Sequence, residues 1–148
     1  MSAISDRINQ TLEKMGIWAD VEERSIAEIS IPYINIVTDD ARLLIGVGAR
    51  NLWALEYLVK RLLERDEPET GGFFIDVNGY RLHHLEEVKA DAKNVAKKVR
   101  LYRTELMLKP MSPFERRIVH MALAEYPDII TQSVGEGETR RVVIKPYP

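Results

Sequence analysis

Residues 113–127, PFERRIVHMALAEYP, carry two arginines and a histidine close together on one predicted short helix. At about 100° per residue, Arg116 and His120 lie side by side one turn apart, and Arg117 lies on the same polar side. A guanidinium and an imidazole can both donate hydrogen bonds to one phosphate, so this spacing is suited to binding an anion. The spacing alone is equally compatible with an ordinary solvated helix face.

Local signals indicate where this helix begins. Ser112 stands at the expected N-cap, Pro113 at the first helical position and Glu115 three residues after the cap, which together predict a capping box. The apolar side chains that follow share one broad arc opposite the arginines and are expected to face the core. They are Phe114, Ile118, Val119, Ala122, Leu123 and Tyr126.

The charged residues are distributed unevenly along the chain. The formal net charge is −2, which taken alone argues against a nucleic-acid-binding protein. Residues 1–40 carry 3 basic and 8 acidic side chains, whereas residues 89–117 carry 9 basic and 3 acidic ones, so the second segment has a local field that attracts phosphate. Part of it is a basic stripe on a predicted helix, which is otherwise explained as a solvated face. The stripe consists of Lys89, Lys93, Lys97 and Arg100.

Length and composition limit the class of protein. The chain has 148 residues, 45% of them hydrophobic, which suits one ordinary domain or two very small ones. No run approaches the ~18 apolar residues of a membrane span, and the first residues show no signal-peptide pattern, so we expect neither a membrane helix nor secretion. The chain has no cysteine, which excludes disulfides and thiolate metal sites and fits the reducing cytoplasm.

Hydrophobic periodicity and turn residues predict an α+β fold of two compact units, residues 1–79 and 80–148, divided at an Asn-Gly turn. The long helix of the second unit is expected to end with Tyr102 facing the core. In the first unit we expect a helix over 5–15, strands over 17–23 and 26–37, helices over 41–45 and 51–65, and a strand over 73–77. In the second we expect a helix over 80–103, a strand over 105–108, the helix that begins at Pro113, and strands over 128–134 and 140–145.

A glycine turn separates two predicted helices of the first unit. It does not match a dinucleotide-binding GxGxxG fingerprint, because Asn51 occupies the last position. The order helix–strand–strand–helix–helix–strand instead resembles a KH domain of the prokaryotic type (type II), whose GxxG loop holds the backbone of about four nucleotides. The resemblance implies that the loop contacts RNA, although Ala49 stands where the family has its second glycine. The loop residues are Gly46, Val47, Gly48, Ala49 and Arg50, the last of which supplies a cation.

The second unit resembles the R-three-H domain, a small α+β unit with a three-stranded sheet that is associated with single-stranded nucleic acids. The family is named for an arginine and a histidine separated by three residues, which here are Arg116 and His120 in MSPFERRIVH. An S-x-G step at 133–135 and the run GEGETRRVVI follow in the family's order. The family also places a basic residue on its last strand, which implies a role for Arg140 and Arg141.

A KH domain followed directly by an R-three-H domain resembles the Jag family, the SpoIIIJ-associated proteins of bacteria. The resemblance extends from about residue 5 to Pro146 and includes LEKMG, LWALEYLV and NGYR. The N-terminal Jag domain that many members carry ahead of the KH unit is missing from this sequence. The resemblance implies cytoplasmic binding of single-stranded RNA, or single-stranded DNA, in the regulation of cell elongation or the envelope. The implied protein partners are a small KH-domain protein, a membrane-protein insertase or a second copy of the chain.

We therefore predict a non-enzymatic protein that binds single-stranded RNA and uses no cofactor and no metal. Arg116 and His120 would hold phosphate, helped by Arg117 and by Arg140 or Arg141. The alternative is a protein-interaction or dimerisation module whose glycine loop has lost RNA binding. An enzyme is the weakest hypothesis, because His120 has no evident nucleophile or carboxylate partner in the sequence.

Two further groups have ordinary structural explanations. The run HHLEE at 83–87 contains metal-ligand types, but adjacent histidines on a helix point about 100° apart, and such a run is typical of a solvated helix start. Trp18, Trp53 and Tyr57 have rings that can stack on bases. Packing is nevertheless the more common role of an aromatic pair at i and i+4, such as Trp53 and Tyr57.

Overall fold

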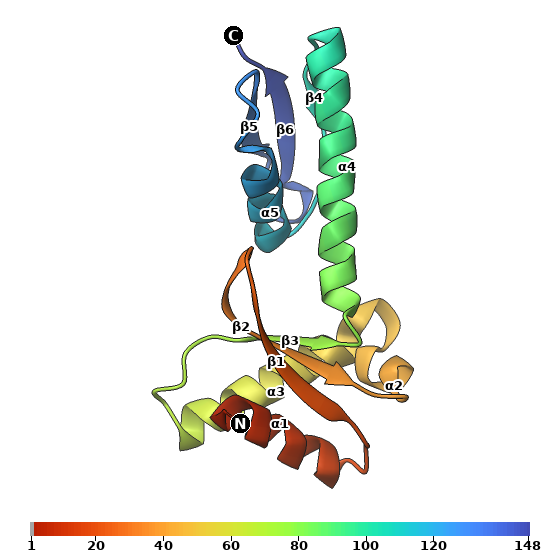
Figure 1. The fold of residues 1–148 in the computed structure, drawn as a ribbon, viewed down its shortest axis with the longest axis vertical. Coiled ribbons are helices and arrows are strands. Elements are labelled where there is room, and N and C mark those ends of the chain that lie inside the picture. Colours follow the sequence, from red (N-terminus) through yellow and green to blue (C-terminus); the bar gives the residue numbers. More distant parts are fainter. Residues whose placement is uncertain (1) are drawn as a thin grey trace. The chain divides into compact units, whose positions relative to one another are not determined.

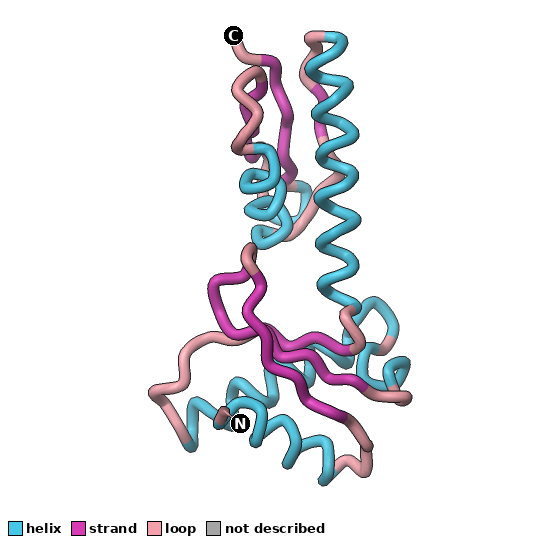
Figure 2. The backbone as a smooth tube through the Cα atoms, in the orientation of Figure 1, coloured by secondary structure: helices cyan, strands magenta, loops and turns pink. Residues whose placement is uncertain are grey.

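The computed structural model describes residues 2–148, and its contacts divide the chain into two compact units, with the division between Leu82 and His83. Figure 1 shows the order of the elements, and Figure 2 distinguishes helices, strands and loops. Each unit combines helices with its own three-stranded sheet, so the predicted α+β fold class is confirmed. None of the helices in residues 2–148 is both long enough and apolar enough to cross a bilayer.

The first unit packs its helices on one face of a mixed sheet. The strand order is β1-β2-β3, with β1 antiparallel to β2 and β2 parallel to β3. Ile34, Ile36 and Ile75 lie on the sheet face that forms a core with apolar side chains of α1 and α3. The elements are α1 (Ala3–Lys14), β1 (Asp20–Ile26), β2 (Ile29–Val37), α2 (Ala41–Ile45), the 3₁₀ turn η1 (Val47–Ala49), α3 (Arg50–Asp66) and β3 (Phe74–Val77).

The first two strands begin later than their periodicity predicted. Gly16 takes a left-handed φ of 74° after α1, and the amide of Ile17 donates to the carbonyl of Leu12 at 2.9 Å, which is the bonding of a Schellman cap. Ile17 is therefore a buried part of the helix end, and the prediction that a strand begins there is wrong. The predicted start of the second strand at Ile26 is also wrong, because this residue ends β1 and residues 27–28 form the hairpin turn.

The second unit packs two helices against an antiparallel sheet of order β4-β6-β5. Ala92, Ala96 and Val99 of α4 form a core with Val119 of α5 and Ile144 of β6. The elements are α4 (Tyr80–Tyr102), β4 (Leu106–Met107), α5 (Pro113–Leu123), β5 (Ile129–Val134), the 3₁₀ turn η2 (Gly137–Thr139) and β6 (Arg141–Pro146).

Tyr102 does not face this core, contrary to the prediction. Its side chain is 70% exposed, and Val99 is the last buried residue of α4. The apolar helix face continues to Tyr102, but the core on which that face packs ends one turn earlier. The chain leaves the helix at Arg103, which takes a left-handed φ of 55°.

Candidate nucleic-acid interface

Helix α5 begins with the predicted capping box. The hydroxyl of Ser112 accepts from the amide of Glu115 at 3.2 Å, and the Glu115 carboxylate accepts from the amide of Ser112 at 3.2 Å. The second carboxylate oxygen of Glu115 lies 2.8 Å from Nε2 of His84 on α4. The Glu115 side chain therefore caps the first turn of α5 and also contacts the neighbouring helix α4.

His120 lies at the interface between α5 and β5, where both of its ring nitrogens have partners. Nδ1 lies 2.6 Å from Oγ1 of Thr131, and Nε2 lies 3.0 Å from Oγ of Ser133. Burial, and to a smaller extent the positive charge of Arg116, lower the pKa of His120 below its ordinary value. The shift favours the neutral imidazole, and both ring nitrogens lie within hydrogen-bond distance of hydroxyl groups on β5 instead of facing solvent.

Arg116 and Arg140 line one hollow of about 590 Å³. Nη1 of Arg116 donates to the carbonyl of Met111 at 2.7 Å, and Nη1 of Arg140 donates to the carbonyl of Gly135 at 2.6 Å. A guanidinium has five N–H donors, so each side chain is oriented by one contact and keeps donors for a ligand. We call this site the arginine hollow; it is lined by Pro110, Met111, Ser112, Pro113, Arg116, Gly137, Glu138 and Arg140.

The other predicted arginines of this unit do not line the hollow. Arg117 is exposed on α5, one residue from Arg116. Arg141 is half-buried at the first position of β6, and its Nε donates to the carbonyl of Thr139 at 3.2 Å. The structure thus brings Arg116 together with Arg140 and leaves Arg117 and Arg141 outside this site.

Two members of the basic stripe are engaged within the fold. Lys89 forms an ion pair with Glu86 at 3.1 Å. Arg100 donates to Asp128 at 2.8 Å, a contact that holds the pKa of that carboxyl below its usual value, and its guanidinium lies 5.2 Å from the ring of Tyr126. The other two members, Lys93 and Lys97, are exposed along α4.

The predicted glycine loop is a tight turn between α2 and α3. Gly46, Gly48 and Ala49 have φ values of 73°, 61° and 63°, all in the left-handed region. A Cβ at Gly46 would lie 2.7 Å from the side chain of Asn51, which donates to the carbonyl of Leu43 at 2.7 Å. Gly46 is therefore required both for its backbone conformation and for the close approach of this amide.

Ala49 takes a left-handed φ of 63°, a conformation that favours glycine. A left-handed L-residue costs roughly 1–2 kcal/mol, and here the methyl group is buried in the core of the first unit, where it recovers part of that energy. Val47, at the tip of the loop, is 87% exposed, and Arg50 is exposed at the start of α3. The loop therefore presents a valine and one arginine to solvent.

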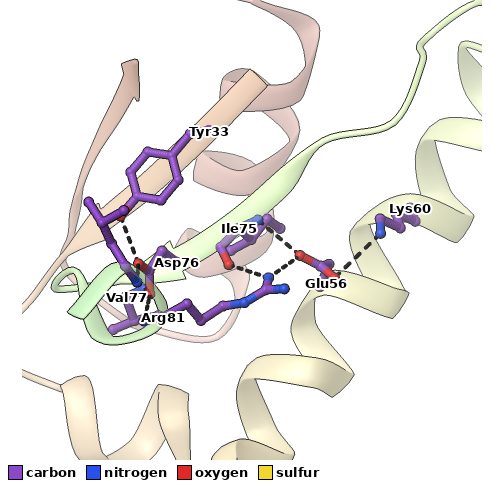
Figure 3. Close-up of polar contacts among 8 residues, drawn as sticks. Tyr33, Glu56, Lys60, Ile75, Asp76, Val77 and Arg81 are labelled. Atoms are coloured by element: carbon purple, nitrogen blue, oxygen red, sulfur yellow. Dashed lines mark hydrogen bonds and ion pairs between the residues drawn. The ribbon is translucent and has the colours of Figure 1, made fainter. Parts of the chain in front are cut away.

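A buried polar network in the first unit was not predicted (Figure 3). The fully buried carboxylate of Asp76 accepts from the hydroxyl of Tyr33 at 2.7 Å and from the amides of Arg81 and Leu82 at 2.8 and 3.0 Å. Burial and the Asp76 carboxylate raise the pKa of the Tyr33 hydroxyl well above its ordinary value. The hydrogen bonds of Asp76 thus connect β3 to β2 and to the first turn of α4.

Glu56 forms the other half of this network, as Figure 3 also shows. Its carboxylate accepts from the amide of Ile75 at 2.9 Å and from Nη1 of Arg81 at 2.7 Å. The Arg81 guanidinium also lies 3.5 Å from the ring centroid of Phe74 and 4.4 Å from that of Trp53. The sequence signal that was available is the single acidic residue in the apolar strand FFIDV, since a charged residue inside a buried strand needs partners.

The aromatic and histidine residues weighed above have separate surroundings. Trp53 is half-exposed beside Arg81, and Trp18 is 91% exposed, so neither is a core residue. His83 pairs with Glu87 at 3.1 Å on α4. Across residues 2–148, no three His, Cys, Asp or Glu side chains are grouped so that they could hold a metal ion.

Comparison with known proteins gives two kinds of similarity. Residues 86–146 match the family model of the R-three-H domain. The chain is 31% identical over 137 residues to the RNA-binding protein KhpB of Clostridium symbiosum, which covers 93% of this chain and 62% of the relative. It is 36% identical over 112 residues to the RNA-binding protein KhpB of Bacillus subtilis, which covers 74% of this chain and 54% of the relative.

A third relative, the RNA-binding protein KhpB of Lactiplantibacillus plantarum, is 27% identical over 144 residues, which covers 96% of this chain and 44% of the relative. The chain therefore spans roughly half the length of the curated relatives that it matches. The predicted R-three-H domain is confirmed, whereas the KH assignment of the first unit stays a prediction. Residues 86–146 are an R-three-H domain, carried by a chain that is homologous to the RNA-binding proteins named KhpB.

Proposed function

We propose that this chain binds single-stranded RNA without catalysing a reaction, and that the arginine hollow holds a phosphate of the RNA backbone. The observation that carries the proposal is the placement of Arg116 and Arg140 at one open hollow, each oriented by a carbonyl. Two guanidiniums suit one phosphate because their planar donor groups pair with its oxygens. Glu138 lies on the same hollow, which leaves one positive charge in excess.

His120 acts in this proposal as a positioning residue. Its contacts with Thr131 and Ser133 attach α5 to β5 one turn after Arg116, and so fix the direction in which the arginine leaves the helix. Arg141 and Arg117 contribute positive potential near the hollow without lining it. The three relatives described above are named RNA-binding proteins, which supports RNA as the ligand.

We further propose that the first unit is a KH-like domain of type II. Its element order and the turn at residues 46–50 support this assignment. Arg50 and the backbone around Gly46 and Gly48 would then guide the RNA backbone across the unit. The proposed compartment is the cytoplasm, and the proposed protein partner is a small KH-domain protein or a second copy of the chain, as the Jag resemblance implies.

The competing candidate is a protein-interaction module. The exposed Val47 in the turn and the alanine at position 49 favour it, because neither side chain offers a donor to phosphate. In that case the first unit would bind a protein, and RNA binding would be confined to the R-three-H domain or lost.

The test is the binding of a fluorescein-labelled eight-nucleotide uridine RNA, measured by anisotropy at several salt concentrations. If about three phosphates are neutralised, log K should fall with log salt at a slope near −2. Arg116→Ala and Arg140→Ala should each raise Kd by about tenfold, and together they should flatten the salt slope. Arg61→Ala is the matched control, because it removes the same charge from the exposed face of α3. Equal losses in Arg61→Ala and Arg116→Ala would exclude the arginine hollow, and no binding at low salt would exclude RNA as the ligand.

A further inference from the structure

A second hollow in the same unit adjoins the arginine hollow. It has a volume of about 350 Å³ and lies between α4 and the segment that follows β4. Met111 lines both hollows, so the two are neighbours on the surface of this unit. The volume falls near the lower end of the range for small-molecule sites, about 300–1,000 Å³, and is suited to one small planar group.

The floor of this second hollow is apolar. Val88 and Leu108 are buried members of the core, and Val95 and Met111 are partly buried against it. A phosphate placed here would lose water without gaining donors from the floor, which is unfavourable. A planar aromatic group would instead cover apolar surface, which is favourable at about 25 cal/mol per Å².

The rim is polar and comes mainly from one side of α4. Asp91, Asn94 and Lys98 follow one another at helical spacing, and Lys109 faces them from the segment after β4. Within residues 2–148, none of these four side chains makes a hydrogen bond or an ion pair with another residue. The rim therefore combines a free carboxylate, a free amide and two free ammonium groups above an apolar floor.

We propose that this second hollow binds one nucleobase of the RNA whose phosphate lies in the arginine hollow, and that it prefers guanine. The inference rests on the proposed function. Guanine carries the N1–H and N2–H₂ donors on one edge, which match the Asp91 carboxylate, and the O6 and N7 acceptors on another, which match Lys98 or Lys109. Uracil has a single N–H donor, and adenine lacks the O6 acceptor, so each leaves part of the rim unpaired.

The proposal adds a property that the arginine hollow does not have. Contacts to phosphate hold the strand but carry no information about its sequence. A base held beside that phosphate supplies such information, because its edge has to match the donors and acceptors of the rim. Nucleobase recognition by this domain would therefore depend on α4, a helix that carries neither residue of the Arg116–His120 pair.

The test compares seven-nucleotide uridine RNAs whose central base is guanine, adenine, cytosine or uracil. Wild-type protein should bind the guanine RNA about fivefold or more tightly than the uridine RNA. Asp91→Asn removes a negative charge, so it should strengthen binding to all four RNAs while reducing the guanine preference to less than twofold. Lys98→Ala should also reduce the preference, whereas Lys93→Ala, on the same helix but outside the hollow, should leave the preference unchanged.

A second measurement locates the base. Titration of guanosine 5′-monophosphate into protein labelled at its methionine methyl groups should shift the Met111 signal more than uridine 5′-monophosphate does, and Asp91→Asn should abolish the difference. Equal Kd values for all four RNAs in wild type, with Arg116→Ala still weakening each, would overturn this inference and leave the proposed function intact. Absence of binding to every RNA would overturn the proposed function and this inference with it.

Discussion

Nδ1 of His120 lies 2.6 Å from Oγ1 of Thr131, so the histidine of the R-three-H pair is hydrogen-bonded to strand β5. Its second nitrogen is bonded to Ser133 on the same strand. The arginine of the pair, Arg116, instead lines the arginine hollow. The two residues that spacing places side by side therefore have different roles: one attaches the helix to the sheet, and the other is available to a ligand.

The attachment of α5 by His120 should be measurable as stability. His120→Ala removes two hydrogen bonds of about 1 kcal/mol each, so the free energy of unfolding should fall by about 2 kcal/mol. Thr131→Val removes one of the two hydrogen bonds and should lower the free energy of unfolding by about half as much. Urea denaturation followed by circular dichroism provides both values. A His120→Ala protein of wild-type stability would contradict the positioning role.

The same histidine predicts a dependence of stability on pH. Burial lowers its pKa, so the unfolded chain binds more protons at this residue than the folded chain does. Its contribution to stability is fully present above the ordinary pKa of about 6.5 and is lost as the pH falls. Between about pH 7 and pH 5 the free energy of unfolding should decrease more steeply for wild type than for His120→Gln. The variant keeps His83 and His84, so identical slopes for the two proteins would refute the assignment to His120.

The capping box should determine how well the first turn of α5 is formed. Ser112→Ala removes the side-chain acceptor for the amide of Glu115 and should cost about 1 kcal/mol. Ser112→Asp is the matched control, because a carboxylate is an equally good N-cap and should preserve the melting temperature. If both variants melt at the same lowered temperature, the loss of stability does not come from the N-cap hydrogen bond, and the prediction is wrong.

Two glycines of the loop at 46–50 should differ in their tolerance of alanine. Gly48 has a φ of 61° and open space around a Cβ, so Gly48→Ala should cost roughly 1–2 kcal/mol. Gly46 combines a φ of 73° with a ψ of −180°, a region that only glycine adopts readily, and its Cβ would meet Asn51 at 2.7 Å. Gly46→Ala should therefore lose at least 1 kcal/mol more than Gly48→Ala in thermal or urea unfolding. Equal losses would show that the turn relaxes away from Asn51.

The ion pair between Glu56 and Arg81 should be important for the stability of the first unit. Glu56→Ala leaves the guanidinium of Arg81 without its carboxylate partner and the amide of Ile75 without its acceptor, at a cost of about 3 kcal/mol or more. Trp53 lies 4.4 Å from this guanidinium, so its fluorescence in a Trp18→Phe background reports unfolding of this unit. Lys60→Ala is the control, because it removes the longer 3.4 Å contact to Glu56, together with an approach of 5.6 Å to the ring of Phe73, and leaves the Glu56–Arg81 pair in place. A Glu56→Ala protein as stable as this control would contradict the prediction.

Much of the fold was predictable because its signals are local. The capping box at Ser112, the glycine turns and the apolar periodicity of α3 and α4 all act within a few residues, and the structure follows them closely. The errors occurred where a distant or competing contact decided the outcome. Ile17 is apolar and follows a turn, which predicted a strand, but it closes a Schellman cap on α1.

The sequence by itself determined the class of fold, the start of α5 and the concentration of basic residues after residue 89, because these depend on neighbours in the chain. Only the tertiary structure decided that His120 forms hydrogen bonds with β5 and that Arg116 and Arg140 line the same hollow. It also revealed that Met111 lines both that hollow and a second one. The physical reason is that hydrogen bonds and hollows between segments depend on which segments pack together, and residue spacing along one helix carries no information about its neighbours in space.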